Sequence, residues 1–454
     1  MNSVQRIIIF FTQSVLIFCQ TNSDNYFLHQ SKKLFYDAGK DWNSLTVFGP
    51  VRYTSKTENE LKKIPSSTYI DLNIGLNSNK DYYSLYGFGH FVYKNHYYGY
   101  LNPTFIVREV EHHQSDIRTN LLNSWNDHSG LGFKNSWVVL QIGRGKENWG
   151  AGEDIQLALS ENSSPYDYFL LASDYGNIRV RYIYGLLEKI QSNINRYITA
   201  RAFEWTNKKS LIVGLSETVI YSGENRSFEI SYLNPISSHL EIELNNRLNS
   251  NDDNSSNAVW QVHFDYLINK NTRLSINYLL DEFVLDPDIE IGKENGKAFS
   301  YRLSYTPQLR NGHILTLYSS FVHVGTPTFR HGSGINNFVQ NGRPLGWYRG
   351  SDGRELCIGL NYFNHKNLIF NFYNGVLHRG DETITNRIFE PYSDYLRGPF
   401  PSGIVDKTYF FGTSIFYYFK ANYSISAAFN NFKNKKVFEL KINIPINKLF
   451  SNGS

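Results

Sequence analysis

Several residue types are rare in this sequence, and their rarity limits the classes of protein to which the chain can belong. Met occurs once, Cys twice and Pro 13 times among 454 residues, and no apolar run is long enough to cross a membrane as a helix. The mean hydropathy of −0.41 is also too low for a protein that crosses a membrane with helices. Length alone still allows two or three soluble domains or one large β-barrel.

Cysteine usage and charge narrow the choice further. Cys19 lies in a predicted leader, so the mature chain would keep only Cys357 and could form no internal disulfide. The net charge is only +4, and no basic cluster indicates nucleic acid or an anionic surface. We therefore expect no nucleic-acid partner.

Motifs for catalysis are missing as well. The chain has no G-x-S-x-G or H-E-x-x-H motif, and the pair His112 and His113 has no further ligands at metal-binding spacing. We interpret acidic pairs such as Glu241 with Glu243 as solvated neighbours on the lumen wall and not as catalytic carboxylates. We predict that the protein is not an enzyme and holds neither a metal nor a cofactor.

Alternating strands dominate what is present. In the last stretch, Val437 to Phe450, apolar residues from Phe438 to Ile446 fall on one phase and polar residues such as Glu439 and Lys441 on the other. The same pattern recurs along the chain. The clearest apolar sets are Trp260, Val262, Phe264 and Tyr266; Leu240, Ile242 and Leu244; Phe299, Tyr301, Leu303 and Tyr305; and Ile178, Val180, Tyr182 and Tyr184.

Charged residues keep to the opposite phase, where a wet lumen would solvate them, and avoid the phase that would face lipid. With Tyr and Phe at 33 and 32 residues for aromatic girdles, this pattern predicts an all-β transmembrane antiparallel β-barrel of about 18 strands. We expect it to span residues 68–450 in the bacterial outer membrane, in contact with outer-membrane lipid.

The spacing of the strands supports this count. Short joints are expected at 206–209, 234–237, 268–271 and 363–367, and long loops at 281–297, 323–353 and 378–407. Short periplasmic turns and long outer loops are typical of such barrels. Two stretches, 109–135 and 146–176, lack alternation, and either could hide a hairpin. The first contains a possible amphipathic helix from Asp116 to Trp125.

The N-terminus reads as a secretory signal peptide over residues 1–23, with Arg6 before an apolar run and small residues before the cleavage site. A lipoprotein signal ending at Cys19 is the rival, but Phe18 is bulky where that signal needs a small residue. Residues 24–67 are predicted as a periplasmic lead-in with a short helix ending at Gly39.

Three patches lack the alternation of apolar and polar residues that is typical of the strands. The first is G-R-G-K-E-N-W-G-A-G from Gly143 to Gly152, followed by L-S-E-N-S-S-P. The second is R-P-L-G from Arg343 to Gly346, followed by G-S-D-G. The third is the Pro- and Gly-rich run 392–404.

These patches, with a final strand reading I-N-I-P-I, resemble the Wzi-like capsule assembly proteins of bacterial outer membranes and related barrels linked to gliding motility. The resemblance implies about eighteen strands, helical material that partly plugs the periplasmic side, and a non-enzymatic role in binding, assembling or attaching capsular or exopolysaccharide. Protein partners from an export or motility machine are also implied.

Two groups of residues are candidates for function. The first group belongs to the first patch and consists of Gly143, Arg144, Trp149, Gly150 and Gly152. Successive strands alternate in direction, and counting them places this patch at the periplasmic end. We interpret it as a structural plug. Trp347, Tyr348, Arg349 and Asp352 should lie in an outer loop, where rings and polar groups suit sugar.

Two alternatives stay open. One is a porin or polysaccharide exporter whose lumen wall carries Arg179, Arg181, Arg201 and Arg302. The other is an outer-membrane scaffold of a motility or secretion machine.

Overall fold

The computed structural model describes residues 34, 37–38, 69–79, 83–94, 96–106, 123–191, 193–245, 247–248, 256–281, 291–309, 312–364, 366–392, 397–419, 424–433 and 435–448. The predicted signal peptide 1–23, most of the lead-in 24–67 and residues 116–122 of the predicted amphipathic helix lie outside these ranges. The last three residues of that helix, from Asn123 to Trp125, instead begin strand β4, so for them the prediction was wrong.

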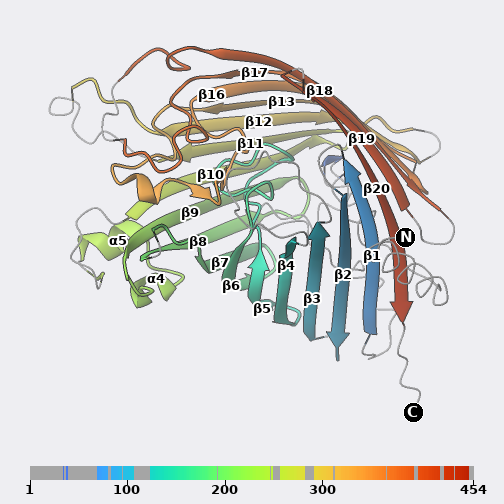
Figure 1. The fold of residues 1–454 in the computed structure, drawn as a ribbon, viewed down its shortest axis with the longest axis horizontal. Coiled ribbons are helices and arrows are strands. Elements are labelled where there is room, and N and C mark those ends of the chain that lie inside the picture. Colours follow the sequence, from blue (N-terminus) through green and yellow to red (C-terminus); the bar gives the residue numbers. More distant parts are fainter. Residues whose placement is uncertain are drawn as a thin grey trace, which may run out of the picture.

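Eighteen strands form one closed antiparallel sheet, in which each strand pairs with its neighbours in sequence and β1 pairs with β20 (Figure 1). The predicted barrel and its strand count are confirmed. The strands are β1 (Tyr69–Asn79), β2 (Tyr83–Tyr93), β3 (Tyr97–Ile106), β4 (Asn123–Lys134), β5 (Val138–Gly145), β6 (Tyr166–Asp174), β7 (Ile178–Leu186), β8 (Ile194–Thr206), β9 (Leu211–Glu224), β10 (Ser256–Asn269), β11 (Thr272–Leu280), β12 (Lys297–Tyr305), β13 (Ile314–Val324), β16 (Gly353–Phe363), β17 (Leu368–Arg379), β18 (Asp406–Tyr418), β19 (Ser424–Phe432) and β20 (Lys435–Lys448).

Among the described residues, the named elements outside the barrel wall are short. They are the helices α4 (Ile230–Leu233) and α5 (His239–Leu244), the 3-10 helix η2 (Gly334–Asn336) and a small hairpin of β14 (Val339–Gln340) and β15 (Arg343–Pro344). Among the residues that the structure describes, no helix is long and apolar enough to cross a membrane.

In β10 and β12 the alternation along the strand separates an apolar exterior from a polar interior. On β12, Leu303 and Tyr305 are 42% and 48% exposed, whereas the inward Arg302 is 2% exposed. β10 follows the same rule, with Val262 47% exposed on the outside and His263 fully buried on the inside. The outward-facing sets predicted for these two strands are therefore confirmed.

Connections alternate between a short-turn end and a long-loop end, because consecutive strands run in opposite directions. The predicted short turns after β8, β10 and β16 and the long loops after β11, β13 and β17 are confirmed. Asparagine builds two of the short turns, since its side-chain oxygen accepts the backbone N–H groups that the turn leaves unpaired. Asn207 binds Lys209, Ser210 and Leu211, and Asn364 binds Lys366, Asn367 and Leu368, all at 2.8–2.9 Å.

One predicted strand is wrong. The apolar set of Leu240, Ile242 and Leu244 belongs to helix α5, where Ser238 caps the first turn by accepting the Glu241 N–H at 3.2 Å. The predicted short joint 234–237 therefore lies within one long connection, 225–255, between β9 and β10. Alternation over five residues cannot separate a strand from a short helix when a capping residue precedes it.

Arg201 was also misplaced by sequence. Its neighbours on the same phase of β8 are Phe203 and Trp205, which are 46% and 39% exposed, so Arg201 lies on the outer wall. There it pairs with Glu217 of β9. Arg179, Arg181 and Arg302 do face the lumen, where each pairs with a carboxylate.

The barrel predicts a depth-dependent cost for charge on its outer face. Ile358 lies at the middle of β16 and is 55% exposed, whereas Tyr305 ends β12 at the short-turn end. Ile358→Lys should lower the free energy of unfolding in lipid vesicles by about 2–4 kcal/mol, and Tyr305→Lys by only about 0–1 kcal/mol. Chemical denaturation of both variants measures the difference. Equal losses would contradict the assignment of the lipid-facing band.

Candidate functional site

Residues 146–165, which follow β5, turn into the lumen; we call them the inward segment. In Figure 1 this segment is the teal trace inside the curve of the sheet. Its backbone bonds to polar side chains of the wall: Ala151 donates to Asn277 Oδ1 at 2.7 Å and Ala158 to Gln261 Oε1 at 3.0 Å. Ser300 Oγ donates to the Ile155 carbonyl at 2.7 Å. Strands β10, β11 and β12 thus hold the inward segment in place, although the segment itself forms no helix or strand.

Glu147 is the main anchor of the inward segment. Its carboxylate is fully buried and accepts two hydrogen bonds from Arg181 of β7, at 2.8 and 2.9 Å. Trp149 Nε1 and the Tyr168 hydroxyl each donate to it at 2.9 Å. Together with the two bonds from Arg181, these four hydrogen bonds compensate for the cost of removing the Glu147 charge from water. Sequence reasoning did not find Glu147, because its partner lies 34 residues away on another strand.

The motif glycines are explained by backbone geometry. Gly150 and Gly152 have φ angles of +139° and +80°, which side-chain-bearing residues rarely adopt. A Cβ on Gly143 would lie 2.2 Å from the Ser129 carbonyl oxygen of β4, so the strands could not approach as they do. Arg144 is different, since it pairs at 3.0 Å with Asp167, whose side chain is 60% exposed.

The inward segment hangs from the long-loop end, so the predicted periplasmic position of the motif was wrong. Counting alternate strand directions gave the wrong end because strand β6, Tyr166–Asp174, was not recognised within the irregular stretch 146–176. Its inward residues, Tyr166, Tyr168 and Leu170, are themselves apolar or aromatic and pack on the inward segment. A strand with such residues on both faces shows no alternation of polar and apolar residues.

The first and second patches pack against each other. Ser160 donates its N–H to the Leu345 carbonyl at 2.8 Å, and Trp347 donates to the Leu157 carbonyl at 3.1 Å. Trp149 and Trp347 are 0% and 1% exposed and belong to the same apolar cluster. The loop 325–352 therefore descends into the lumen mouth and covers the inward segment.

The residues predicted to bind sugar lie mostly inside this packing. Arg349 donates to Glu355 at 2.9 Å, and its guanidinium stacks between the rings of Tyr348 and Phe432 at 4.2 and 4.3 Å. Burial, reinforced by the Glu355 carboxylate, raises the pKa of Tyr348 well above its ordinary value. Trp347, Tyr348 and Arg349 thus line the interior and do not form an exposed aromatic platform.

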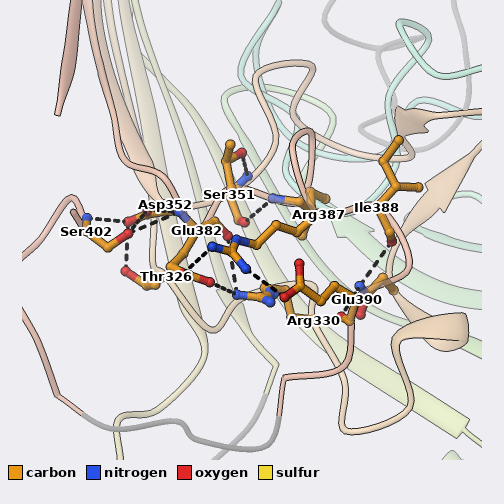
Figure 2. Close-up of polar contacts among 12 residues, drawn as sticks. Thr326, Arg330, Ser351, Asp352, Glu382, Arg387, Ile388, Glu390 and Ser402 are labelled. Atoms are coloured by element: carbon orange, nitrogen blue, oxygen red, sulfur yellow. Dashed lines mark hydrogen bonds and ion pairs between the residues drawn. The ribbon is translucent and has the colours of Figure 1, made fainter. Parts of the chain in front are cut away.

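Asp352 joins the second and third patches (Figure 2). It is fully buried, and its two oxygens accept hydrogen bonds from Thr326 Oγ1 at 2.8 Å, Ser402 N at 2.9 Å and Glu382 N at 3.1 Å, with Ser402 Oγ as a further donor. All these donors lie in loops 325–352 and 380–405. The position of Asp352 therefore fits a loop clamp better than a ligand contact.

A partly exposed cluster lies beyond this clamp; we call Arg330, Glu382, Arg387, Glu390 and Tyr392 the loop crown. Arg330 pairs with Glu382 at 2.8 Å and stacks on the Tyr392 ring at 3.8 Å (Figure 2 shows the ion pair). Arg387 pairs with Glu382 and with Glu390, whose side chain is 51% exposed. Burial raises the pKa of Tyr392, against the opposing effect of Arg330. Sequence reasoning named only Tyr392, as the start of the third patch.

Residues of the predicted lead-in also enter the lumen toward the short-turn end. Asp37, from the predicted lead-in, accepts two hydrogen bonds from Arg302 at 2.8 Å and one from Ser304 at 2.9 Å. Leu34 and Ala38 pack against Ile314 and Phe416 in one buried cluster. The described part of the lead-in therefore lies within the barrel.

A cavity of about 250 Å³ remains in the lumen beside β17–β20. Its polar lining includes Asn371, Ser414, Asn430 and the ion pair of Glu439 with Lys441. Such a lining suits water or a small hydrophilic solute. Within the described residues, no three His, Cys, Asp or Glu side chains gather as a metal site.

A closed antiparallel barrel with an apolar exterior, short turns at one end and long loops at the other defines a bacterial outer-membrane β-barrel of 18 strands. The predicted location in the bacterial outer membrane is thereby confirmed. No family model matches the sequence, and no curated protein matches it.

Among solved structures, the fold is similar to Wzi of Escherichia coli, described as an outer-membrane protein involved in group 1 capsule assembly and a carbohydrate-binding β-barrel. The TM-score is 0.66 at 11% identity, over 92% of this chain and 98% of that chain. The Wzi-like fold expected from sequence is thus confirmed. OprD and OccK2 of Pseudomonas aeruginosa are less similar, with TM-scores of 0.46 and 0.47 at 9% identity, over 84% of this chain and 95% and 98% of theirs.

The anchoring role of Glu147 predicts that two substitutions in the same motif lower the stability of the protein by very different amounts. Glu147→Gln leaves the Arg181 guanidinium without its charged partner in a buried site, and should lower the free energy of unfolding by about 3–5 kcal/mol. Arg144→Gln breaks an exposed pair and should cost less than about 1 kcal/mol. Denaturant titration in detergent micelles distinguishes them, and similar losses would contradict the anchoring role of Glu147.

The Asp352 clamp predicts a local effect on loop order. Asp352→Asn replaces one acceptor oxygen by a donor, so amide hydrogen exchange should accelerate across residues 380–392 and 397–405. Asp381→Asn is the control, because this exposed residue accepts a single bond from Ile404 N at 2.8 Å. Unchanged exchange in the Asp352 variant would show that the clamp does not hold the loops.

Proposed function

We propose that the protein is a non-enzymatic, plugged outer-membrane barrel that holds capsular or exopolysaccharide at the cell surface. The observation that carries this proposal is the burial of the lumen wall. Nine inward polar residues in the central parts of β10–β12 would be wet in an open channel, yet they are at most 4% exposed. They are Gln261, His263, Asp265, Arg273, Ser275, Asn277, Ser300, Arg302 and Ser304.

The filled wall supports an anchor rather than a porin or exporter, because a conducting barrel needs a continuous wet path lined by such groups. Filling comes from both ends: the inward segment and loop 325–352 enter from the long-loop end, and Asp37 from the short-turn end. The scaffold alternative does not depend on the lumen, and the test below distinguishes it.

The loop crown is the better candidate for sugar contact than the residues around Trp347. Tyr392 presents a partly exposed ring with Arg330 beneath it, and rings of this kind stack on the C–H faces of sugars. At the same surface, Arg387 can donate to hydroxyl or carboxylate groups of a sugar, and Glu390 can accept from its hydroxyl groups. Each contact would be weak, but a polymer with repeated units can occupy many barrels at once and gain avidity.

The crown predicts which substitutions weaken binding. Tyr392→Ala and Arg387→Ala should each lower the affinity for the cell's own purified surface polysaccharide several-fold, measured by interferometry on protein in lipid nanodiscs. Lys209→Ala, in a short turn at the opposite end, is the matched control and should not change it.

Affinity that is unchanged in both crown variants would refute the assignment of the crown. Wild-type protein that binds no polysaccharide would refute the proposed function and favour a protein partner.

A further inference from the structure

The connection between β9 and β10 lies on the outside of the barrel. We call its described part, residues 225–245 and 247–248, the outer flap; it contains α4 and α5, beside β8 and β9 in Figure 1. Tyr182 of β7 donates its hydroxyl to the Tyr232 carbonyl at 2.6 Å, and His239 N donates to Glu217 of β9 at 3.0 Å. Tyr182 and Glu217 belong to the outward phases of their strands, so the flap covers the outer wall.

A stack of rings fixes the flap to the wall. The rings of Tyr197 and Tyr221 lie 4.9 Å apart at 18°, those of Tyr221 and Tyr232 5.0 Å at 20°, and those of Tyr232 and His239 6.2 Å at 14°. Tyr232 and Ile242 of the flap are both fully buried. The flap is therefore packed as tightly as a core element, although it lies outside the sheet.

Beneath the flap lies a charged pair that could not face lipid directly. Arg201 and Glu217 occupy opposite positions on β8 and β9, are only 9% and 5% exposed, and approach to 3.3 Å. Trp260 Nε1 of β10 also donates to Glu217 at 2.8 Å. Charge on the outward phase is costly in a bilayer, so the flap is needed to shield this pair.

The outer face of the flap carries many apolar side chains, together with the exposed polar residues Asn234, Glu243, Asn245 and Arg247. Six of its large apolar side chains are between 40% and 89% exposed. They are Phe228, Ile230, Leu233, Ile236, Leu240 and Leu244.

The uncovered wall below the flap is too short to span a bilayer. On β9, the outward residues below Glu217 run only from Leu211 to Leu215. At about 3.3 Å per residue and a tilt of about 40°, this stretch rises about 10 Å, compared with an apolar band about 25 Å tall in such barrels. The flap contacts Glu217 and Tyr221, outward positions of β9 beyond this stretch, and its apolar residues would continue the band toward the long-loop end.

We propose that the outer flap is embedded in the outer leaflet, with its apolar face in contact with lipid acyl chains. Lipid is favoured over a protein partner because the face is continuous with the lipid-facing surface of Leu215 and Phe203, which are 54% and 46% exposed. The flap thus makes a second layer of the barrel wall at β7–β10, and lipid contact passes from the strands to the flap. This inference rests on the membrane location of the barrel and not on polysaccharide binding.

Fluorescence quenching in reconstituted vesicles tests this inference. Cys357, the one cysteine of the predicted mature chain, is replaced by serine, and bimane is attached at Ile236→Cys or Leu244→Cys, positions that are 89% and 81% exposed. Leu215→Cys is the lipid-facing control and Lys209→Cys the aqueous control. Brominated phospholipid and aqueous iodide serve as the two quenchers.

We expect brominated lipid to quench both flap labels as strongly as the label at Leu215, and iodide to quench them several-fold less than the label at Lys209. Strong iodide quenching without lipid quenching would show that the flap lies in water and would overturn the proposal. Protection from both quenchers would show that protein covers this face, and would overturn it equally.

Discussion

Every charged or polar side chain on the inner wall of a closed barrel must find a partner, either water or another part of the chain. In this protein the chain supplies many of these partners. Arg181 is held by Glu147 from the long-loop end and Arg302 by Asp37 from the lead-in, both through two hydrogen bonds. Such pairs are stable in a dry lumen only when all their donors and acceptors are matched. This requirement fixes where the inward segment lies and why the lumen is filled.

The same requirement extends to the outer loops. Buried Arg196 of β8 donates to the carbonyls of Asn337 and Val339, and Asp352 accepts from both loops 325–352 and 380–405. Loops tied to the wall in this way present a fixed surface, which reduces the entropy lost when a polymer binds. Loops that are tied to the wall and a lumen that is filled along β10–β12 are the features on which the proposed anchoring function rests. A transport channel would need loops and lumen contents that leave a wet path.

The sequence was sufficient to predict the barrel because the alternation follows from the two environments of each strand. Asp265 of β10 and Arg302 of β12 lie on the inward phase, and the faces of both strands were predicted correctly. β6 was missed because its inward Tyr166, Tyr168 and Leu170 pack on the inward segment, which removes the polar phase. Helix α5 was read as a strand because five residues carry too little periodicity. The role of Asp352 depends on contacts with residues 26–50 positions away, and no local pattern records such contacts.

Single-channel recording in a planar bilayer tests the central claim, a lumen filled by the chain itself, most directly. The account predicts no steady open-pore current for the wild-type protein, and a current for a variant in which residues 148–160 of the inward segment are replaced by a short Gly-Ser linker. A steady current through the wild-type barrel, blocked by polysaccharide added on the outer side, would contradict the account and favour a porin or exporter.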